Sequence, residues 1–294
     1  MKAERPRLIR VGLLLTFTLG LLAVPLAAGA QQPAKVARIG MLWPTERPEL
    51  QLLLDAFRQG LRDLGYAEGQ NIVIEYRSAE RKDERLPDLA AELVRLKVNL
   101  IVVGPTTAAL AAKQATTTIP IVAAGMADPV GDGLVASLAR PGGNITGLTF
   151  LGPELVPKRL ELLKEAVPGV SRVAALWHPG VYGEHTMSEM IKETEVAARA
   201  LGVQLQLVGA GGPNDIDGAF SAMTRGRADA VIVLPSPMLY RQRRRIVDLA
   251  AKHRLPATYG YREAVDAGGL MAYGASIPDL YRRSAIYVDK ILKG

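Results

Sequence analysis

The sequence predicts an α/β protein built from two doubly wound parallel sheets. After residue 35, apolar runs of strand length alternate with longer segments in which apolar residues recur at helical spacing. This alternation is typical of open parallel sheets with helices on both faces. The second observation is an internal repeat, because NLIVVGPTTAAL (99–110) and DAVIVLPSPMLY (229–240) share a polar residue, an apolar run, a proline and a hydroxyl residue. Each copy therefore brings one strand end and one helix start to the same place.

The first half of the chain supplies the first sheet. Nearly continuous apolar runs, such as 36–43 and 100–103, suit strands that are buried on both faces. The stripe of leucines after residue 50 ends at Gly65, a residue that commonly stops a helix. We expect strands at 36–43, 71–76, 100–103, 119–123 and 144–150, the last being a strand or a crossover. We expect helices at 50–64, 86–96 and 130–138, and one that begins at residue 106 or 107.

The second half repeats the alternation. Pro157 lies near the start of its first helix, and Gly202 follows the end of the second. We expect helices at 155–166, 187–201, 216–223, 239–251 and 277–292. We expect strands at 173–177, 203–208, 230–234, 257–259 and 270–273.

Composition narrows the functional class. The chain has 294 residues and no cysteine, which excludes disulfides, thiolate metal sites and a cysteine nucleophile. The formal net charge is +7, and the basic N-terminal segment accounts for part of it. The remainder, about +4, is too small an excess to indicate nucleic-acid binding, so no nucleic-acid partner is expected.

Residues 1–30 resemble an export signal. Lys2, Arg5, Arg7 and Arg10 precede an apolar core at 11–22, which is too short to span a membrane. The small residues Ala28-Gly29-Ala30 fit a cleavage site, so we expect a mature chain that starts near Gln31 in the periplasm. Because the chain has no cysteine to carry a lipid, it is not expected to be lipid-anchored. The alternative is an N-terminal membrane anchor.

A ligand site is expected where the parallel strands end, because open α/β sheets bind ligands outside their carboxyl edges. The loops there collect aromatic side chains, hydroxyl groups and acids suited to a small organic ligand. The candidates are Trp43, Thr45, Thr106, Thr107, Asp128, Tyr182, Ser236, Tyr259, Tyr261 and Glu263.

Several of these residues have a structural alternative. Thr106 and Thr107 lie where free N–H groups of a helix favour an anion, but both are also good helix caps. Asp128 fits either a turn before Pro129 or a contact with a ligand ammonium group. The basic run at 241–245 is read first as a solvated helix face, and otherwise as a docking surface or a positive charge near an anionic ligand.

No catalytic constellation is found in the sequence. It contains no nucleophile elbow, P-loop, zinc-protease motif or dinucleotide-binding glycine motif. His178, His185 and His253 are scattered and are interpreted as structural. We therefore expect no catalytic residue, no metal site and no cofactor.

One long segment carries a family resemblance. ATTTIPIVAAGMADPVGDGLVASLARPGGNITGL (115–148), together with GPTTAALAAK, GLMAYGASIPDLYRR and VDKILKG, resembles ABC-transporter substrate-binding proteins of the tryptophan/tyrosine type. The resemblance implies a type I periplasmic-binding-protein fold, with two lobes joined by a hinge that closes over a small ligand. We expect one lobe at 36–148 plus 275–294 and the other at 151–274.

The resemblance also implies a function. We expect a monomeric periplasmic receptor that captures an amino acid or an aromatic or carboxylate compound and delivers it to an inner-membrane ABC permease. Amino-acid-binding relatives often place Asp or Asn in the loop that reads Pro235-Ser236-Pro237 here, and the loop near Tyr259 is aromatic. Both departures argue against a plain amino-acid ligand. The alternatives are a ligand-sensing domain of a signalling system and a Rossmann-type enzyme.

Overall fold

The computed structural model describes residues 36–46, 50–180, 182 and 184–294. Its first sheet has five parallel strands in the order β2-β1-β3-β4-β5. The expected signal peptide at 1–30 lies outside the described residues. The strands of this sheet are β1 (Ala37–Trp43), β2 (Ile72–Ser78), β3 (Leu100–Val103), β4 (Ile121–Met126) and β5 (Ile145–Thr149).

The second sheet repeats the topology of the first. Its order is β10-β9-β8-β6-β7, so in each sheet the first strand of the half lies between the second and third. The strands are β6 (Arg172–Trp177), β7 (Gln204–Gly209), β8 (Ala230–Val233), β9 (Ala257–Tyr259) and β10 (Met271–Ala272). The prediction of two parallel sheets from a repeated sequence is confirmed.

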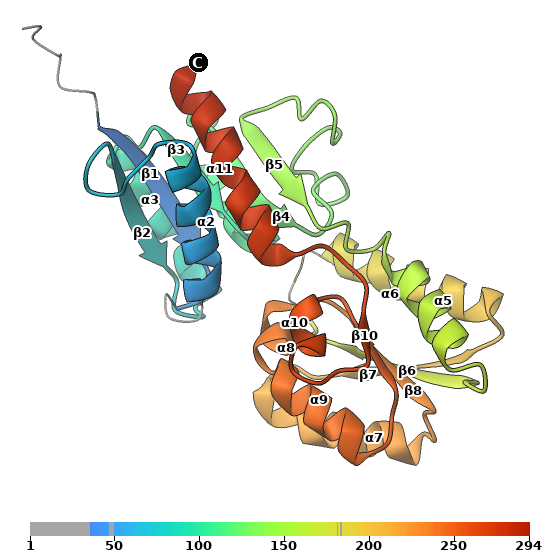
Figure 1. Cartoon of the computed structure of the whole chain (residues 1–294). Helices are drawn as coiled ribbons and strands as arrows, with labels where there is room; N and C mark the ends of the chain where they lie inside the picture. The colour runs from blue at the N-terminus through green and yellow to red at the C-terminus, as the bar shows by residue number, and fades with distance from the viewer. Residues whose placement is uncertain (1–35, 47–49, 181, 183) are drawn as a thin grey trace, which may run out of the picture. The chain divides into compact units, whose positions relative to one another are not determined.

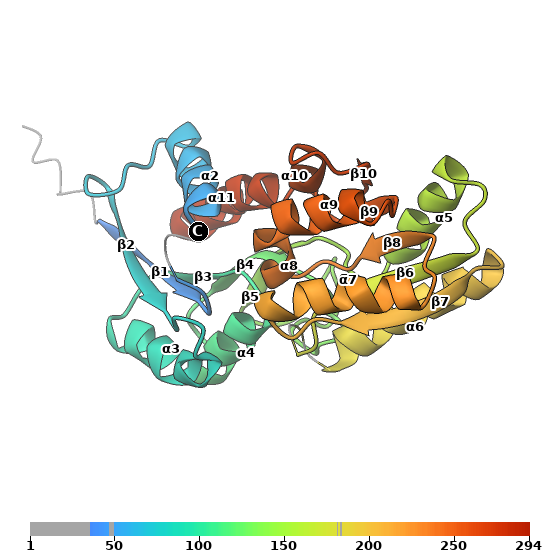
Figure 2. The same cartoon turned by 90° about the horizontal axis from the view of Figure 1, so that it is seen from below.

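Helices cover both faces of each sheet, as Figures 1 and 2 show. The first sheet packs α3 (Leu86–Arg95) and α4 (Thr106–Ala115) on one face. Its other face packs α2 (Gln51–Asp63) and α11 (Ile277–Lys293). The second sheet lies between one layer with α5 (Val156–Ala166) and α6 (Glu184–Ala200) and another with α7, α8 and α9. The latter three span Ile216–Arg225, Pro237–Arg241 and Arg243–Lys252.

Strand burial explains these layers. β3 and β8 are buried along their whole length, as continuous apolar runs require when helices cover both faces. The edge strands β2 and β7 are only partly buried, and their sequences mix polar and apolar residues accordingly. The middle of each sheet is therefore fixed by hydrophobic burial, and the loops that follow it are held in place.

The last helix, α11, returns to the first sheet and packs lengthwise against α2, although the two lie at opposite ends of the chain (Figure 1). Gly60 permits this approach, because a Cβ at that position would lie 2.0 Å from the carbonyl oxygen of Arg282. Tyr66 adds a hydrogen bond of 2.9 Å to the Asp289 carboxylate. Residues 277–293 are thus an integral part of the first lobe's core.

Two segments connect the sheets within the described residues. One runs from β5 through Phe150 to α5, and the other runs from β10 through Ser276 to α11. Arg159 of α5 ties them together, because its Nε donates a 2.7 Å hydrogen bond to the carbonyl oxygen of Tyr273. Phe150 of the first connection and Ile277 at the start of α11 line the cavity described below.

The expected helix at 130–138 is wrong. This segment forms turns and bends, held by a hydrogen bond from the Gly131 N–H to Asp128 Oδ1 (2.8 Å) and by Lys113 Nζ, which donates to the Gly133 carbonyl (2.6 Å). Glycines and nearby side-chain acceptors offer the backbone an alternative to helical hydrogen bonds.

Other expectations differ in detail. The helix expected at 239–251 is divided at Gln242 into α8 and α9, and the strand expected at 270–273 is only two residues long. The short helix α10 (Arg262–Val265) was not expected. Among the described residues, no helix has the length and apolar character needed to cross a membrane.

Candidate functional site

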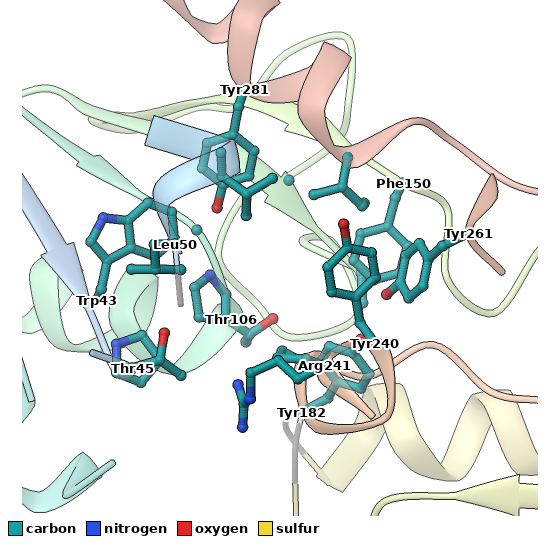
Figure 3. Close-up of a pocket in the computed structure, with 18 residues that line it drawn as sticks. Trp43, Thr45, Leu50, Thr106, Phe150, Tyr182, Tyr240, Arg241, Tyr261 and Tyr281 are labelled. Atoms are coloured by element: carbon teal, nitrogen blue, oxygen red, sulfur yellow. The ribbon is translucent and has the colours of Figure 1, made fainter. Parts of the chain in front are cut away.

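A cavity of about 110 Å³ lies where loops from both sheets meet (Figure 3). The first sheet contributes the segments that follow β1 and β3, and the second contributes α8 and the loop after β9. Both sheets present their carboxyl edge here, as expected for open parallel sheets. The described lining residues are Trp43, Pro44, Thr45, Leu50, Leu53, Gly104, Pro105, Thr106, Gly125, Ala127, Phe150, Tyr182, Pro237, Tyr240, Arg241, Tyr261, Ile277 and Tyr281.

Paired aromatic rings form much of the cavity wall. Trp43 stacks on Tyr281 with ring centroids 5.3 Å apart, and Tyr240 meets Tyr261 edge to face at 5.2 Å. Phe150 lies 6.1 Å from the Tyr182 ring. Such pairs fix ring orientation and leave apolar faces that suit a flat or hydrophobic ligand. The wall is therefore preorganised by contacts within the protein.

Gly104 is required by this packing. A Cβ at residue 104 would lie 1.7 Å from a ring carbon of Trp43 and 2.3 Å from the hydroxyl oxygen of Tyr281. The end of β3 thus passes directly against both rings. A side chain at this position would displace the wall of the cavity.

The phenol groups on the second-lobe side are buried and neutral. The Tyr182 hydroxyl donates a 3.0 Å hydrogen bond to the carbonyl oxygen of Pro235, and burial and the neighbouring Tyr261 raise the pKa of Tyr182 well above its ordinary value. Burial likewise raises the pKa of Tyr261. Burial, together with the Glu263 carboxylate, raises the pKa of Tyr240 to about 12. These hydroxyls act as neutral hydrogen-bonding groups near pH 7.

A buried arginine lies behind this wall. Arg159 is only 1 % exposed, and its Nη1 has no hydrogen-bond partner among the described residues. Burial lowers the pKa of Arg159, while the phenols of Tyr261, Tyr182 and Tyr273 raise it. Of the described residues, no carboxylate forms an ion pair with Arg159. A positive charge is therefore held close to the cavity without an acidic side chain against it.

Thr106 presents an unsatisfied hydroxyl to the cavity. The residue is completely buried, and its Oγ1 has no hydrogen-bond partner in the described chain. It is the first residue of α4, whose N-cap, Pro105, supplies no side-chain hydrogen bond to the helix. In Figure 3 the hydroxyl of Thr106 points into the cavity. Buried polar groups are rarely left unpaired, so this hydroxyl is suited to a ligand.

Arg241 extends from α8 toward Thr45 of the opposite lobe (Figure 3). The same two residues also line an adjoining groove of about 500 Å³, together with Thr107 and His178. Burial lowers the pKa of His178, and the positive charge of Arg241 lowers it further. The groove and the cavity share part of their lining and together form one cleft between the lobes.

The structure brings five of the ten predicted site residues to the cavity. The five that line it directly are Trp43, Thr45, Thr106, Tyr182 and Tyr261. The other five lie outside the cavity lining: Thr107, Asp128, Ser236, Tyr259 and Glu263.

Each of the other five occupies a defined position. Thr107 lines the adjoining groove, and Asp128 accepts a hydrogen bond from the Gly131 N–H while lying 3.7 Å from His185 Nε2. Ser236 Oγ accepts the Leu239 N–H at 3.0 Å and caps α8. Tyr259 is buried in the core of the second lobe, and Glu263 lies beside Tyr240.

Four aromatic or charged lining residues are absent from the predicted site: Phe150, Tyr240, Arg241 and Tyr281. Arg241 belongs to the basic run at 241–245, which the sequence indicates first as a solvated helix face. Tyr240 precedes it on the same short helix. Phe150 and Tyr281 lie outside the loops that follow the strand ends considered in the sequence. Position in the sequence gives no signal for Tyr281, because only the return of α11 to the first lobe brings it to Trp43.

Metal binding finds no support in the described part of the chain. No group of three or more His, Asp or Glu side chains there is arranged to hold an ion.

The fold and the cleft define a class of protein. Two parallel α/β lobes of the same topology, with an aromatic cavity lined from both, form a bilobal small-molecule binding protein of the type I periplasmic-binding-protein kind. The chain belongs to the ABC transporter substrate binding protein family, whose model matches residues 38–294. The family is one of substrate-binding proteins and not of enzymes.

Known proteins resemble the chain over most of its length. A tyrosine-binding protein from Clostridioides difficile is 25 % identical over 88 % of this chain and 74 % of its own. A conserved domain protein from Vibrio cholerae has a TM-score of 0.79 at 28 % identity, covering 88 % of this chain and 86 % of that one. An ABC domain from Streptococcus pneumoniae, solved with L-Trp, has a TM-score of 0.76 at 26 % identity, covering 88 % and 85 %. The expected family and two-lobed fold are confirmed.

Proposed function

We propose that this protein is a monomeric periplasmic receptor that binds an amino acid or an aromatic or carboxylate compound and delivers it to an inner-membrane ABC permease. Residues 1–30 direct export in this proposal, and the ligand leaves chemically unchanged. The observation that carries it is the aromatic cavity, because Trp43 and Thr106 of one lobe face Tyr240 and Tyr261 of the other. Relatives that bind tyrosine or were solved with L-Trp support an aromatic ligand.

Closure of the lobes accompanies binding in this proposal. We assign 36–148 plus 275–294 to one lobe and 151–274 to the other, so the connections at Phe150 and Tyr273 form the hinge. A ligand that contacts both lobes binds the closed arrangement better than the open one and shifts the population toward it. Small-angle scattering of the chain from Gln31 onward should show a smaller radius of gyration with a ligand than without it.

Binding can be followed through tryptophan fluorescence. The chain has two tryptophans, and Trp43 lines the cavity whereas Trp177 ends β6 in the second lobe. A Trp177→Phe variant leaves Trp43 as the reporter. A screen of amino acids and small carboxylates should identify compounds that change its emission saturably and raise the melting temperature by mass action.

Transport is tested separately. Cells that lack the gene should lose high-affinity uptake of the radiolabelled ligand and regain it with the gene on a plasmid. Mass spectrometry of the periplasmic fraction should show a chain beginning near Gln31. A saturable ligand without any uptake defect would contradict the transport role and favour ligand sensing. No saturable ligand in the screen would contradict the receptor function itself.

A further inference from the structure

We propose that the ligand is a small aryl or aryl-alkyl carboxylate that carries no ammonium group, with its carboxylate bound at the start of α4 and its ring between Trp43, Tyr240 and Tyr281. This inference rests on the proposed receptor function and narrows the ligand class. It distinguishes a simple aromatic acid from the matching α-amino acid.

The start of α4 supplies the first argument. The helix is ten residues long, and its N-cap residue Pro105 gives it no capping side chain. Free N–H groups and the positive end of the helix dipole at such a position favour an anion. The fully buried Thr106 hydroxyl lacks a partner among the described residues and points into the cavity at the same place. One carboxylate would satisfy both the hydroxyl and the backbone.

Charge supplies the second argument. Among the described residues that line the cavity, Arg241 is the only one with a charged side chain, and no Asp or Glu lines it. An ammonium group in the cavity would find neutral hydroxyl oxygens as side-chain acceptors but no described carboxylate to offset its lost hydration. The loop Pro235-Ser236-Pro237 contains no carboxylate, and Ser236, whose hydroxyl caps α8, is not among the residues that line the cavity.

The buried Arg159 supplies the third argument. Its guanidinium approaches Gly260, since a Cβ there would lie 3.4 Å from Arg159 Cζ, and Gly260 directly precedes the cavity residue Tyr261. A buried charge without a counter-charge is costly to maintain. An anion in the cavity would interact favourably with both Arg159 and Arg241, whereas a zwitterion would gain less because its two charges oppose one another.

Three probes that share one skeleton test this inference. They are 3-phenylpropionate, its amide 3-phenylpropanamide, and L-phenylalanine, which is 3-phenylpropionate with an added α-ammonium group. Titration calorimetry on the chain from Gln31 onward should show the acid binding at least about tenfold more tightly than either of the others. The amide reports the contribution of the negative charge, and L-phenylalanine reports the cost of the ammonium group.

Two pairs of variants locate the carboxylate. Thr106→Val should weaken acid binding by about tenfold and leave amide binding within about twofold, since it removes one hydrogen bond to a charged group. Thr117→Val, at an exposed threonine just beyond the same helix, should change the binding of neither the acid nor the amide. Arg241→Gln should weaken binding of 3-phenylpropionate more than binding of its amide. Arg244→Gln, on the exposed side of α9, should leave the binding of both compounds unchanged.

The role of Arg159 has its own comparison. Arg159→Met should reduce the preference for acid over amide, and Arg159→Lys, which keeps the charge, should restore much of it. Because Arg159→Met removes a hydrogen bond to Tyr273, circular dichroism must show that the variant is folded. If it does not fold, the Arg159→Lys preference and the Thr106→Val pair still decide the matter.

The outcomes separate this inference from the receptor function. Tighter binding of L-phenylalanine than of 3-phenylpropionate overturns the ligand class and leaves the receptor intact. The same holds if none of the three probes binds while the wider screen finds a ligand that is not an aryl carboxylate or that carries an ammonium group. Selective loss of acid binding in Thr106→Val, but not in Thr117→Val, supports the carboxylate position.

Discussion

Thr106 and Ser236 hold equivalent places in the two halves of the chain, but their hydroxyl groups have different roles. Ser236 is the N-cap of α8, and its Oγ accepts the Leu239 N–H at 3.0 Å. Helix α4 begins one position earlier relative to its proline, so Thr106 lies inside the first turn and its Oγ1 has no partner in the described chain. The repeat thus provides one capping hydroxyl and one hydroxyl for the cavity.

Replacing Ser236 tests the capping role. Ser236→Ala should lower the free energy of unfolding by about 1 kcal/mol, because the Leu239 N–H loses its acceptor in a buried setting. Urea denaturation measures this loss. Ligand affinity, measured by fluorescence, should stay within about twofold of the original protein. A large loss of affinity without a loss of stability would instead place Ser236 among the binding residues.

Gly104 tests the packing of the cavity wall. Gly104→Ala should destabilise the protein by about 1–3 kcal/mol, because the added methyl group overlaps both Trp43 and Tyr281. Trp43 emission should shift in the unliganded protein, and ligand affinity should fall. The matched control is Gly169→Ala, since no atom lies within 4 Å of a Cβ there. Equal stability of the two variants would show that the rings move aside at little cost.

Asp229 gives a prediction for acidic pH. Its Oδ2 accepts hydrogen bonds from the Ser171 N–H (2.9 Å), the Ser171 hydroxyl (2.9 Å) and the Arg172 N–H (2.8 Å). The Ser171 N–H is the main cause of a lowered pKa for Asp229. The resulting stabilisation is present above the ordinary carboxyl pKa of 3.8 and is lost as pH falls through the lower, folded-state value.

The matched variants exploit the repeat. Asp229→Ala should lower the free energy of unfolding by about 1 kcal/mol at pH 7, and Asp229→Asn should lower it by less. Urea denaturation should also show that the stability of Asp229→Asn depends less on pH below 4 than the stability of the original protein. Asn99 is the equivalent residue of the first half, and its Oδ1 accepts the Arg38 N–H at 2.8 Å. Asn99→Asp should therefore introduce an acid dependence of the same sign. If Asp229→Asn and Asn99→Asp both show the same pH dependence of stability as the original protein, the stabilising role of the ionised Asp229 carboxylate is contradicted.

Tyr182 gives a prediction for alkaline pH. Burial raises its pKa well above the ordinary 10.0, so folding favours the protonated phenol. The corresponding stability is complete below pH 10.0 and declines as pH rises toward the folded-state pKa, because the unfolded chain releases this proton first. Tyr182→Phe should make the decline above pH 10 shallower, at a cost of about 1 kcal/mol near pH 7 for the lost hydrogen bond to Pro235. Denaturation at pH 8 to 11 measures both effects.

The order of strands and helices follows from hydrophobic periodicity. β3 and β8 are short apolar runs with prolines after them, and both are central strands in sheets of the same order. The helix expected at 130–138 failed because its apolar residues have helical spacing, while Asp128 and Lys113 satisfy the backbone of that segment in turns. Periodicity records which residues prefer burial, and it does not record competing hydrogen bonds.

The candidate site was predictable only in part. Trp43, Thr106 and Tyr261 follow strand ends, so the rule that ligands bind at carboxyl edges located them. Asp128 and Ser236 follow the same rule, but local hydrogen bonds within their turns engage their side chains. The rule places a loop near the cleft, and the local backbone then decides which way each side chain faces.

The sequence by itself determined the two parallel sheets, their repeated topology and the edge at which the cavity lies, since hydrophobic pattern and chain order can be read directly from it. Tertiary structure decided which side chains meet there. Tyr281 stacks on Trp43, and Arg159 lies behind Tyr261, because α11 and α5 pack across long intervals of sequence. The contacts of α11 with the first lobe depend on close approach at Gly60 and Gly104, which no periodic pattern encodes.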